Sequence, residues 1–218
     1  MIAVISGDIM ASRKIENQGI WIESLQNLFK TWGESPKDWK LERGDFFQVE
    51  VKETAEALKK ALQIKALVKK IKPIDKNKKI SPIDVRLAIG IGEKTYSGDT
   101  ISTSNGSAFI NSGEKFDIIR KENITLGIKT PCCEFDEDIN LYLKLISLFI
   151  DKWTVSSAEL VEIVLNNPTK TQDKIGDMLG IKQSGVSLRW KRANIDEMLE
   201  VEKMYRKKLK LYCYDNTH

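Results

Sequence analysis

The stretch TQDKIGDMLGIKQSGVSLRWKRA, at residues 171–193, carries the pattern of two short helices separated by a tight turn. Gly180 stands where the first of them should end, and glycine readily adopts the left-handed backbone conformation that such a turn requires. Gly176, about one helical turn earlier, lacks a side chain that would hold the second helix at a distance. The sequence therefore predicts that the two helices pack closely across the turn. The apolar residues that share one face of the second helix are Ile181, Val186 and Trp190.

Basic charge gathers on the second of these helices. From Lys182 to Arg192 there are four basic residues and no acidic one, whereas residues 134–138 are acidic. A local basic patch is the expected electrostatic footprint of a surface that contacts phosphates. Short polar and basic side chains on an exposed helix face also suit the base edges of a major groove. The residues that we expect to contact DNA are Gln183, Ser184, Ser187, Arg189, Lys191 and Arg192.

This segment resembles the helix-turn-helix of bacterial regulators and of sigma-factor region 4. A further helix, expected at residues 154–166 and capped by Thr154 or Ser156, precedes it. The resemblance implies that the second helix of the pair reads DNA. Two positions depart from the common pattern: Lys182 stands where a capping serine is common, and Gly185 where alanine is common. Helices that serve only for packing, or that bind another protein, are the alternative interpretations.

The first half of the chain alternates between strand-like and helix-like hydrophobic patterns. Short apolar or alternating runs predict strands, and apolar residues at spacings of three and four predict helices. The β-α-β-β-α-β order within this series is the split βαβ arrangement of ferredoxin-like folds. Strands are expected at residues 2–9, 39–41, 46–51, 85–91 and 124–129, and helices at residues 17–32, 53–71 and 106–120.

After Pro131 the pattern becomes wholly helical. An amphipathic helix is expected at residues 137–151, and a long helix at residues 195–211 could dimerise or cover the core. We therefore expect an α+β protein in which a ferredoxin-like βαββαβ domain is followed by an all-α helix-turn-helix domain. The expected divisions are residues 1–131 for the α/β domain, 132–153 for a connecting helix and 154–218 for the helical domain.

Two carboxylates in the first half stand where strands end. Asp8 lies at the end of the first strand, and Asp45 lies at the tip of the hairpin Arg43-Gly44-Asp45. If these strands lie side by side, the carboxylates converge, as a Mg²⁺ site that bridges nucleotide phosphates requires. Gly44 would let the backbone approach a phosphate closely. In the alternative, structural interpretation, Asp8 caps a turn and Asp45 is an ordinary turn residue of the hairpin. Arg13 and Arg43 would then pair with these acids and hold the loops.

In order and spacing, these motifs resemble class III nucleotidyl cyclase catalytic domains over about residues 1–120. The matching features are Asp8-Ile9 on the first strand, the glycine–aspartate hairpin, and a strand that begins with Arg86 and runs into glycines. The resemblance implies that Asp8, Asp45 and the backbone of Ile9 carry Mg²⁺ or Mn²⁺. It also implies a nucleotide site that contains Arg43, Gly44, Arg86, Asn111 and Lys115.

Several departures count against cyclase activity. Cyclases use an asparagine and an arginine four residues apart, and here Asn111 and Lys115 fit only after a shift of one residue, without the arginine. The positions that select the base hold Leu41 and Thr103, where cyclases have a lysine and an aspartate or its equivalent. A domain that binds a nucleotide is therefore a better expectation than an efficient enzyme.

Over nearly its whole length the chain resembles SatD-like proteins, a bacterial group. The shared motifs are Gly7-Asp8-Ile9 with Ser12-Arg13, the hairpin RGDFFQ at residues 43–48, the strand from Arg86 to Glu93, and the helix from Gly106 to Asp117. This resemblance implies a transcriptional regulator and brings no established chemistry.

Histidine and cysteine usage excludes several classes of catalytic site. His218 is the only histidine, and Cys132, Cys133 and Cys213 lack CxxC spacing, so the chain has no Ser–His–Asp triad, Cys–His pair or usual zinc site. Any catalysis would use carboxylates, lysine and arginine, or an oxygen-ligated metal. No run of about 20 apolar residues occurs, and the first ten residues do not read as a signal peptide. We therefore expect a cytoplasmic location and no membrane partner.

Three hypotheses follow. The leading one is a DNA-binding transcriptional regulator whose cyclase-like domain senses a nucleotide or another ligand. The second is a divalent-metal-dependent nucleotide cyclase or other nucleotide-processing enzyme, and the third is a protein-interaction adaptor that uses the C-terminal helices. A homodimer would suit the first hypothesis, because helix-turn-helix proteins commonly read two-fold sites.

Overall fold

A computed structural model describes residues 1–10, 19–42, 45–72 and 83–213. Within these residues the protein is a mixed α+β structure with a five-stranded sheet and eight α-helices. Two short 3₁₀ helices lie at Thr54–Glu56 and Ile101–Thr103. The strands are β1 (Ile2–Met10), β2 (Trp39–Leu41), β3 (Phe46–Val51), β4 (Asp84–Gly92) and β5 (Leu126–Lys129). The helices are α1 (Gly19–Lys30), α2 (Ala57–Lys70), α3 (Ser107–Glu122), α4 (Cys133–Ile150), α5 (Val155–Asn166), α6 (Gln172–Leu179), α7 (Gln183–Ala193) and α8 (Ile195–Cys213).

The sheet has the order β2-β3-β1-β4-β5, and only the β4–β5 pair is parallel. Side chains alternate between its two faces, so Phe47 packs with α1 and α2 while neighbouring Phe46 packs against Phe116 of α3. The central strand β1 follows the same alternation: Ile5 belongs to the first of these cores, whereas Ser6 accepts a hydrogen bond from Ser112 of α3. The sheet is therefore covered on both faces.

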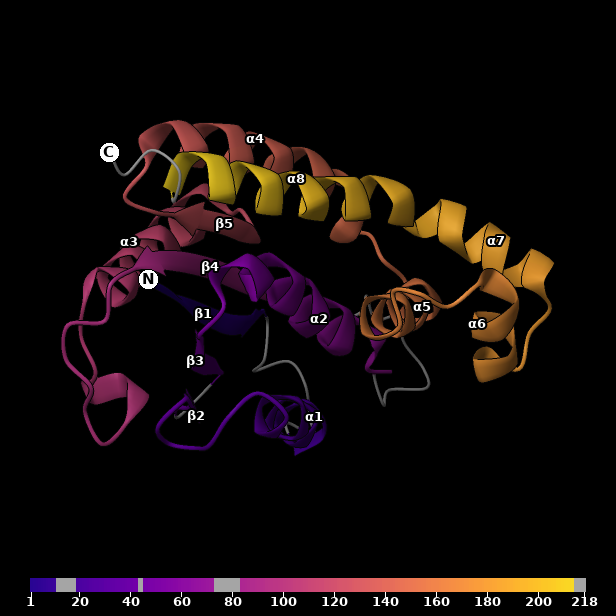
Figure 1. The fold of residues 1–218 in the computed structure, drawn as a ribbon. Coiled ribbons are helices and arrows are strands. Elements are labelled where there is room, and N and C mark those ends of the chain that lie inside the picture. Colours follow the sequence, from indigo (N-terminus) through magenta and orange to yellow (C-terminus); the bar gives the residue numbers. More distant parts are fainter. Residues whose placement is uncertain (11–18, 43–44, 73–82, 214–218) are drawn as a thin grey trace.

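The C-terminal helices pack against the first half of the chain. Figure 1 shows α4 and α8 side by side across the top of the molecule, with α5, α6 and α7 gathered at one end. The ammonium of Lys70 on α2 bonds both carboxylate oxygens of Glu162 on α5, and the Tyr205 hydroxyl of α8 donates to the carbonyl of Thr54. One continuous cluster of buried apolar side chains runs from β1 to α8. The predicted divisions at residues 131 and 153 thus do not interrupt the core, and division into separate domains stays a prediction.

Most predicted elements are present, with shifted ends. The helix predicted at residues 53–71 is a 3₁₀ turn followed by α2, and the strand predicted from residue 124 begins only at Leu126. The reason for the later start is Asn123, which ends α3 in a left-handed conformation (φ 55°) and lets the amide of Ile124 bond back to Ile119. In the described part of the chain, no helix combines the length and apolar character needed to cross a bilayer.

Candidate functional site

Local chemistry fixes the turn between α6 and α7. The Thr171 hydroxyl caps α6 by accepting from the amide of Lys174 (3.5 Å). Gly180 adopts φ +64°, and the amide of Ile181 donates to the carbonyl of Gly176 (3.0 Å). A Cβ atom on Gly176 would lie 2.7 Å from the Ile181 carbonyl oxygen, so only glycine permits this approach. The predicted roles of both glycines are confirmed.

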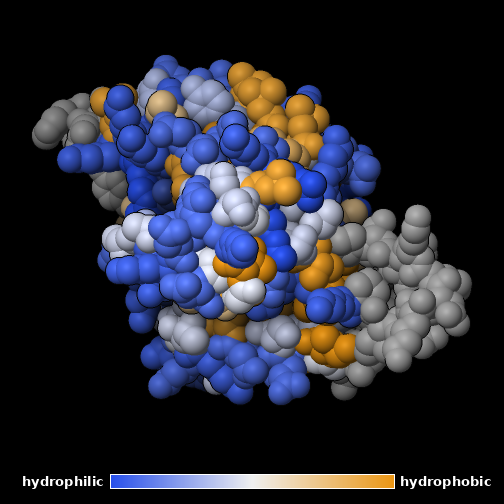
Figure 2. Space-filling model, turned by 90° about the vertical axis from the view of Figure 1, so that its right-hand side faces the viewer, coloured by the Kyte–Doolittle hydropathy of each residue, from blue (hydrophilic) through white to orange (hydrophobic). Residues whose placement is uncertain are grey.

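The α6–α7 pair has an apolar inner face and a polar outer face. Ile175 and Val186 are buried, and Trp190 is half-buried, with its indole N–H donating to Asp196 (2.9 Å). Figure 2 views this end of the molecule and shows a mainly hydrophilic surface with small apolar patches. Two exposed apolar side chains lie on the pair, Met178 and Leu188, each about half exposed.

The residues predicted to contact DNA lie on α7 with unequal exposure. Gln183, Ser184, Lys191 and Arg192 are exposed, and Ser187 and Arg189 are half-buried. Gln183 donates a side-chain hydrogen bond to Gln172 of α6 (3.0 Å), and Arg189 forms an ion pair with Glu159 of α5 (3.4 Å). Lys182 occupies the N-cap position of α7 without a side-chain cap, as its replacement of serine predicts.

A cavity of about 290 Å³ lies behind the helix pair. Ile175, Trp190 and Leu199 supply apolar lining, and Lys59 and Arg206 are among its charged residues. The cavity therefore lies where residues of α2, α5, α6, α7 and α8 meet.

A second group of polar residues gathers where β1 ends. Asp8 stands directly opposite Arg86 in the β1–β4 register, and the two side chains form an ion pair at 3.4 Å. The Oδ1 atom of Asp8 and the Nε atom of Arg86 are buried and lack hydrogen-bond partners within the described structure. Buried polar atoms of this kind are rare in folded proteins, so the pair offers unused hydrogen-bonding capacity.

Asp45 lies next to this pair, as the sequence predicts. Its backbone carbonyl accepts from the amide of Ile9 (3.2 Å), which joins the start of β3 to the end of β1. Burial raises the pKa of the Asp8 carboxyl, Arg86 opposes that shift, and the charge of Asp45 adds to it. Arg120 of α3 also lowers the pKa of Asp8 and is a neighbour that sequence reasoning missed.

The groups near the end of β1 are of the chemical type, carboxylate oxygens, that divalent cations such as Mg²⁺ bind. Asp8 Oδ1 is a carboxylate oxygen that finds no hydrogen-bond partner among the described residues, and a second carboxylate, Asp45, is near enough to raise its pKa. Among the described residues no group of three or more His, Cys, Asp or Glu side chains is placed to hold a metal ion. Such an ion would therefore be held by Asp8, Asp45 and the backbone near Ile9, with the remaining positions left to ligand or water oxygens. Arg43 and Gly44 lie outside the described residues.

Asn111 and Lys115 do not join this group. The Asn111 amide donates to the carbonyl of Ile91 near the far end of β4 (2.8 Å). Lys115 lies over Gly127 of β5, where burial lowers its pKa and the charge of Asp136 partly offsets that effect. Both side chains therefore extend from α3 toward β4 and β5, away from Asp8. Arg86 is the predicted nucleotide-site residue that lies beside Asp8.

The glycines of β4 serve the packing of α3. A Cβ atom on Gly90 would lie 2.2 Å from the amide nitrogen of Ser112, and one on Gly92 would lie 2.3 Å from the Ser107 hydroxyl. The glycine-rich strand therefore lets the helix rest directly on the sheet.

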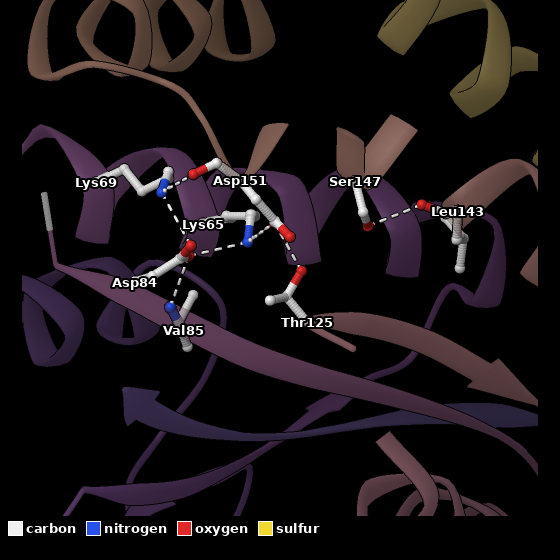
Figure 3. Close-up of polar contacts among 8 residues, drawn as sticks. All are labelled: Lys65, Lys69, Asp84, Val85, Thr125, Leu143, Ser147 and Asp151. Carbon is white, nitrogen blue, oxygen red and sulfur yellow. Dashed lines mark hydrogen bonds and ion pairs between the residues drawn. The ribbon is translucent and has the colours of Figure 1, made fainter. Parts of the chain in front are cut away.

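Sequence reasoning missed a cluster of charges around two buried lysines, with the partly exposed Asp84 and Asp151, that joins the two halves of the chain (Figure 3). Lys65 contacts Asp84 at 2.9 Å and Asp151 at 2.7 Å, and Lys69 contacts Asp84 at 2.9 Å. Thr125 donates to Asp151, and Lys69 donates to the Asp151 carbonyl. We call Lys65, Lys69, Asp84 and Asp151 the buried charge cluster. A signal existed, because Lys65 and Lys69 continue the spacing of the buried Leu58 and Leu62 along one face of α2.

The sequence matches no protein-family model and no curated protein.

Proposed function

We propose that the chain is a DNA-binding transcriptional regulator, in which α6 and α7 form a helix-turn-helix and α7 is the recognition helix. The observation that carries the proposal is the tight α6–α7 turn at Gly180 together with the polar, basic outer face of α7. Lys191 and Arg192 are exposed at the end of α7 and suit phosphates, while Gln183 and Ser184 at its start suit base edges. The resemblance to SatD-like regulators supports the same function.

The proposal assigns the N-terminal half a sensing role. The sheet order β2-β3-β1-β4 is compatible with a ferredoxin-like, cyclase-like domain. Asp8 Oδ1, which has no hydrogen-bond partner in the part of the chain that the structure describes, lies near Asp45 and supports a ligand that brings Mg²⁺ or Mn²⁺ with its phosphates. Arg86 would meet the same phosphates. When bound, the cation neutralises phosphate charge, whereas the chain supplies two carboxylates and a guanidinium.

The test is fluorescence anisotropy on labelled DNA from the region upstream of the gene, at two salt concentrations. We expect binding that weakens as salt rises, because cationic side chains release counterions from DNA. Lys191→Ala and Arg192→Ala should each weaken binding to all sequences and reduce the salt dependence by about one released ion. Lys203→Ala is the matched control, since Lys203 is a 79% exposed lysine on α8.

Addition of ATP or GTP with Mn²⁺ tests the sensing role. A shift in DNA affinity that disappears in Asp45→Asn supports it. DNA binding that is unchanged in the α7 variants would remove α7 from the interface, and failure to bind any DNA would favour a protein partner for these helices.

The proximity of Asp8 and Asp45 favours one alternative, a nucleotide-processing enzyme. It predicts metal-dependent turnover of a nucleoside triphosphate that Asp45→Asn abolishes. Absence of turnover with all common triphosphates would retire this alternative and leave the sensing role in place.

A further inference from the structure

The outward face of α4 carries a row of exposed leucines. Leu141, Leu145 and Leu148 are 55%, 52% and 64% exposed, and their spacing of four and three residues places them in one stripe. The opposite face of the same helix packs against the core through its buried side chains, which are Phe135, Ile139, Leu143, Ile146 and Ile150. Figure 2 shows apolar surface along the upper edge of the molecule, where α4 lies in Figure 1. A contiguous apolar patch of this kind commonly marks an interaction site.

Charges of opposite sign flank the leucine stripe. Glu134 and Glu137 are exposed in the first turns of α4, and Lys152 is exposed just beyond its end. Lys144 is also exposed beside the stripe, and its long side chain can direct the ammonium to solvent at the rim. A second α4 helix laid antiparallel, with Leu145 opposite its own copy, brings Leu141 of one chain to the Leu148 end of the other. The same register brings Glu137 close to Lys152 of the other chain. The two ends of the stripe are therefore complementary in charge when the helix pairs with its own copy.

We propose that α4 is the interface of a two-fold homodimer, in which the leucine stripes of two copies pack antiparallel around Leu145. A second copy of this chain is the occupant that the charge pattern favours, because the acidic end of α4 meets the basic end of an identical helix when the two are laid antiparallel. The proposal stands apart from DNA binding.

The dimer also has a geometric consequence that rests on the proposed function. The 18 residues of α4 span about 27 Å, and α5 to α7 follow its C-terminal end. With Leu145 at the two-fold axis, the C-terminal ends of the two α4 helices lie about 15 Å apart, because Ile150 is five residues from the axis in each chain. Antiparallel pairing therefore directs the α5–α7 segments of the two copies to opposite sides of the axis. The two copies could then read two half-sites.

Sedimentation equilibrium of the full chain over a wide concentration range tests the proposal. We expect a monomer–dimer equilibrium that Leu145→Asp weakens by at least a hundredfold, because two carboxylates would face each other at the two-fold axis. Glu137→Lys and Lys152→Glu should each weaken the dimer, and the double exchange should restore it. Ile110→Asp is the control, since Ile110 is a 55% exposed apolar residue on α3.

Three outcomes would overturn the proposal: a monomer at every concentration, a dimer that survives Leu145→Asp, or a failure of the double charge exchange to restore association. Binding of the wild-type monomer to lipid vesicles through the leucine stripe would assign the stripe to a membrane surface instead. DNA binding by a strictly monomeric protein would overturn the dimer and leave the proposed function standing.

Discussion

At the scale of single residues, Asp8 is subject to opposing influences. Burial and the neighbouring Asp45 favour its protonated form, whereas Arg86 and Arg120 favour its charged form, and the net pKa lies above the usual value of 3.8. The folded protein therefore holds this proton more tightly than the unfolded chain does. As pH rises from 3.8 through the raised pKa, ionisation of Asp8 lowers the free energy of unfolding.

We predict that Mg²⁺ reverses this shift. NMR titration of the Asp8 carboxyl carbon should give a midpoint above 3.8 without metal and a lower midpoint with Mg²⁺, because a bound cation favours the carboxylate. Arg86→Ala should raise the metal-free midpoint further, because it removes a positive charge. Lys115→Ala should leave it unchanged. A midpoint that is insensitive to Mg²⁺ would argue against a cation at Asp8.

The cysteines give a second prediction at this scale. Burial raises the pKa of Cys213 to about 11, with Cys132 close by, whereas Cys133 is exposed. At pH 8 only about 0.1% of Cys213 should be thiolate, the form that reacts. Brief alkylation with iodoacetamide followed by mass spectrometry should therefore label Cys133 well before Cys213. The order should disappear in denaturant, and early labelling of Cys213 in the native protein would contradict the prediction.

At the scale of elements, the α6–α7 turn depends on one close backbone approach. A Cβ atom on Gly176 meets a backbone oxygen, which cannot move without shifting α7. A Cβ atom on Gly185 meets only the side chain of Ile181, at 3.6 Å, an ordinary contact distance. An alanine side chain would therefore clash at Gly176 but would fit at Gly185.

We predict opposite effects of the same substitution at these positions. Gly176→Ala should lower the free energy of unfolding by about 1–3 kcal/mol, through overpacking. Gly185→Ala should be neutral or stabilise by up to about 1 kcal/mol, because alanine has the higher helix propensity. Urea unfolding measures both. If the two variants were equally stable, the close approach at Gly176 would not be what fixes the turn.

The elements themselves could largely be predicted from the sequence. Strands β2 and β3 follow the alternation of apolar residues, and Gly180 marks the end of α6 through its backbone freedom. The proximity of Asp8 and Asp45 also follows from local order, since Asp8 lies near the end of β1 and Asp45 lies just before the antiparallel strand β3 begins. Asn111 and Lys115 could not be placed, because their partners, Ile91 and Gly127, lie on strands whose register no local pattern gives.

At the scale of the whole molecule, the buried charge cluster fastens α2, β4 and the end of α4 to one another. Burial acts to raise the pKa of Asp84, but Lys65 and Lys69 outweigh it and hold the pKa below its usual value. The stability that Asp84 contributes is therefore present above pH 3.8 and is lost as pH falls through the lowered pKa. Sequence reasoning missed this cluster because a lysine in a helix reads as solvent-exposed until its buried partner, distant in sequence, is known.

We predict that Lys65→Met destabilises the protein by about 2–4 kcal/mol, because Lys69 alone then balances the carboxylates of Asp84 and Asp151, and solvent at the partly exposed Asp151 offsets part of the loss. The side chain of Lys65 is 0% exposed, so methionine can fill the same space but cannot replace the lost positive charge. Adding Asp151→Asn to Lys65→Met should recover part of the loss, because it restores neutrality around Lys69 and Asp84. Thermal unfolding of the two single variants and the double variant gives the coupling energy.

Lys203→Met is the control, since Lys203 is exposed and its change should alter stability by no more than about 0.5 kcal/mol. Additive effects of Lys65→Met and Asp151→Asn would show that the two charges act independently. In that case the ion pair between Lys65 and Asp151 would contribute no coupling energy between the two halves of the chain.

The buried charge cluster also limits which substitutions related sequences can carry at these four positions. Its two lysines and two aspartates balance one another, so a relative that loses the Lys65 charge should carry a neutral residue at position 84 or 151 as well. These positions should therefore vary as a set, with single losses rare and paired losses tolerated. Lys203, whose ion-pair partner Glu200 is itself exposed, should change freely from one relative to the next.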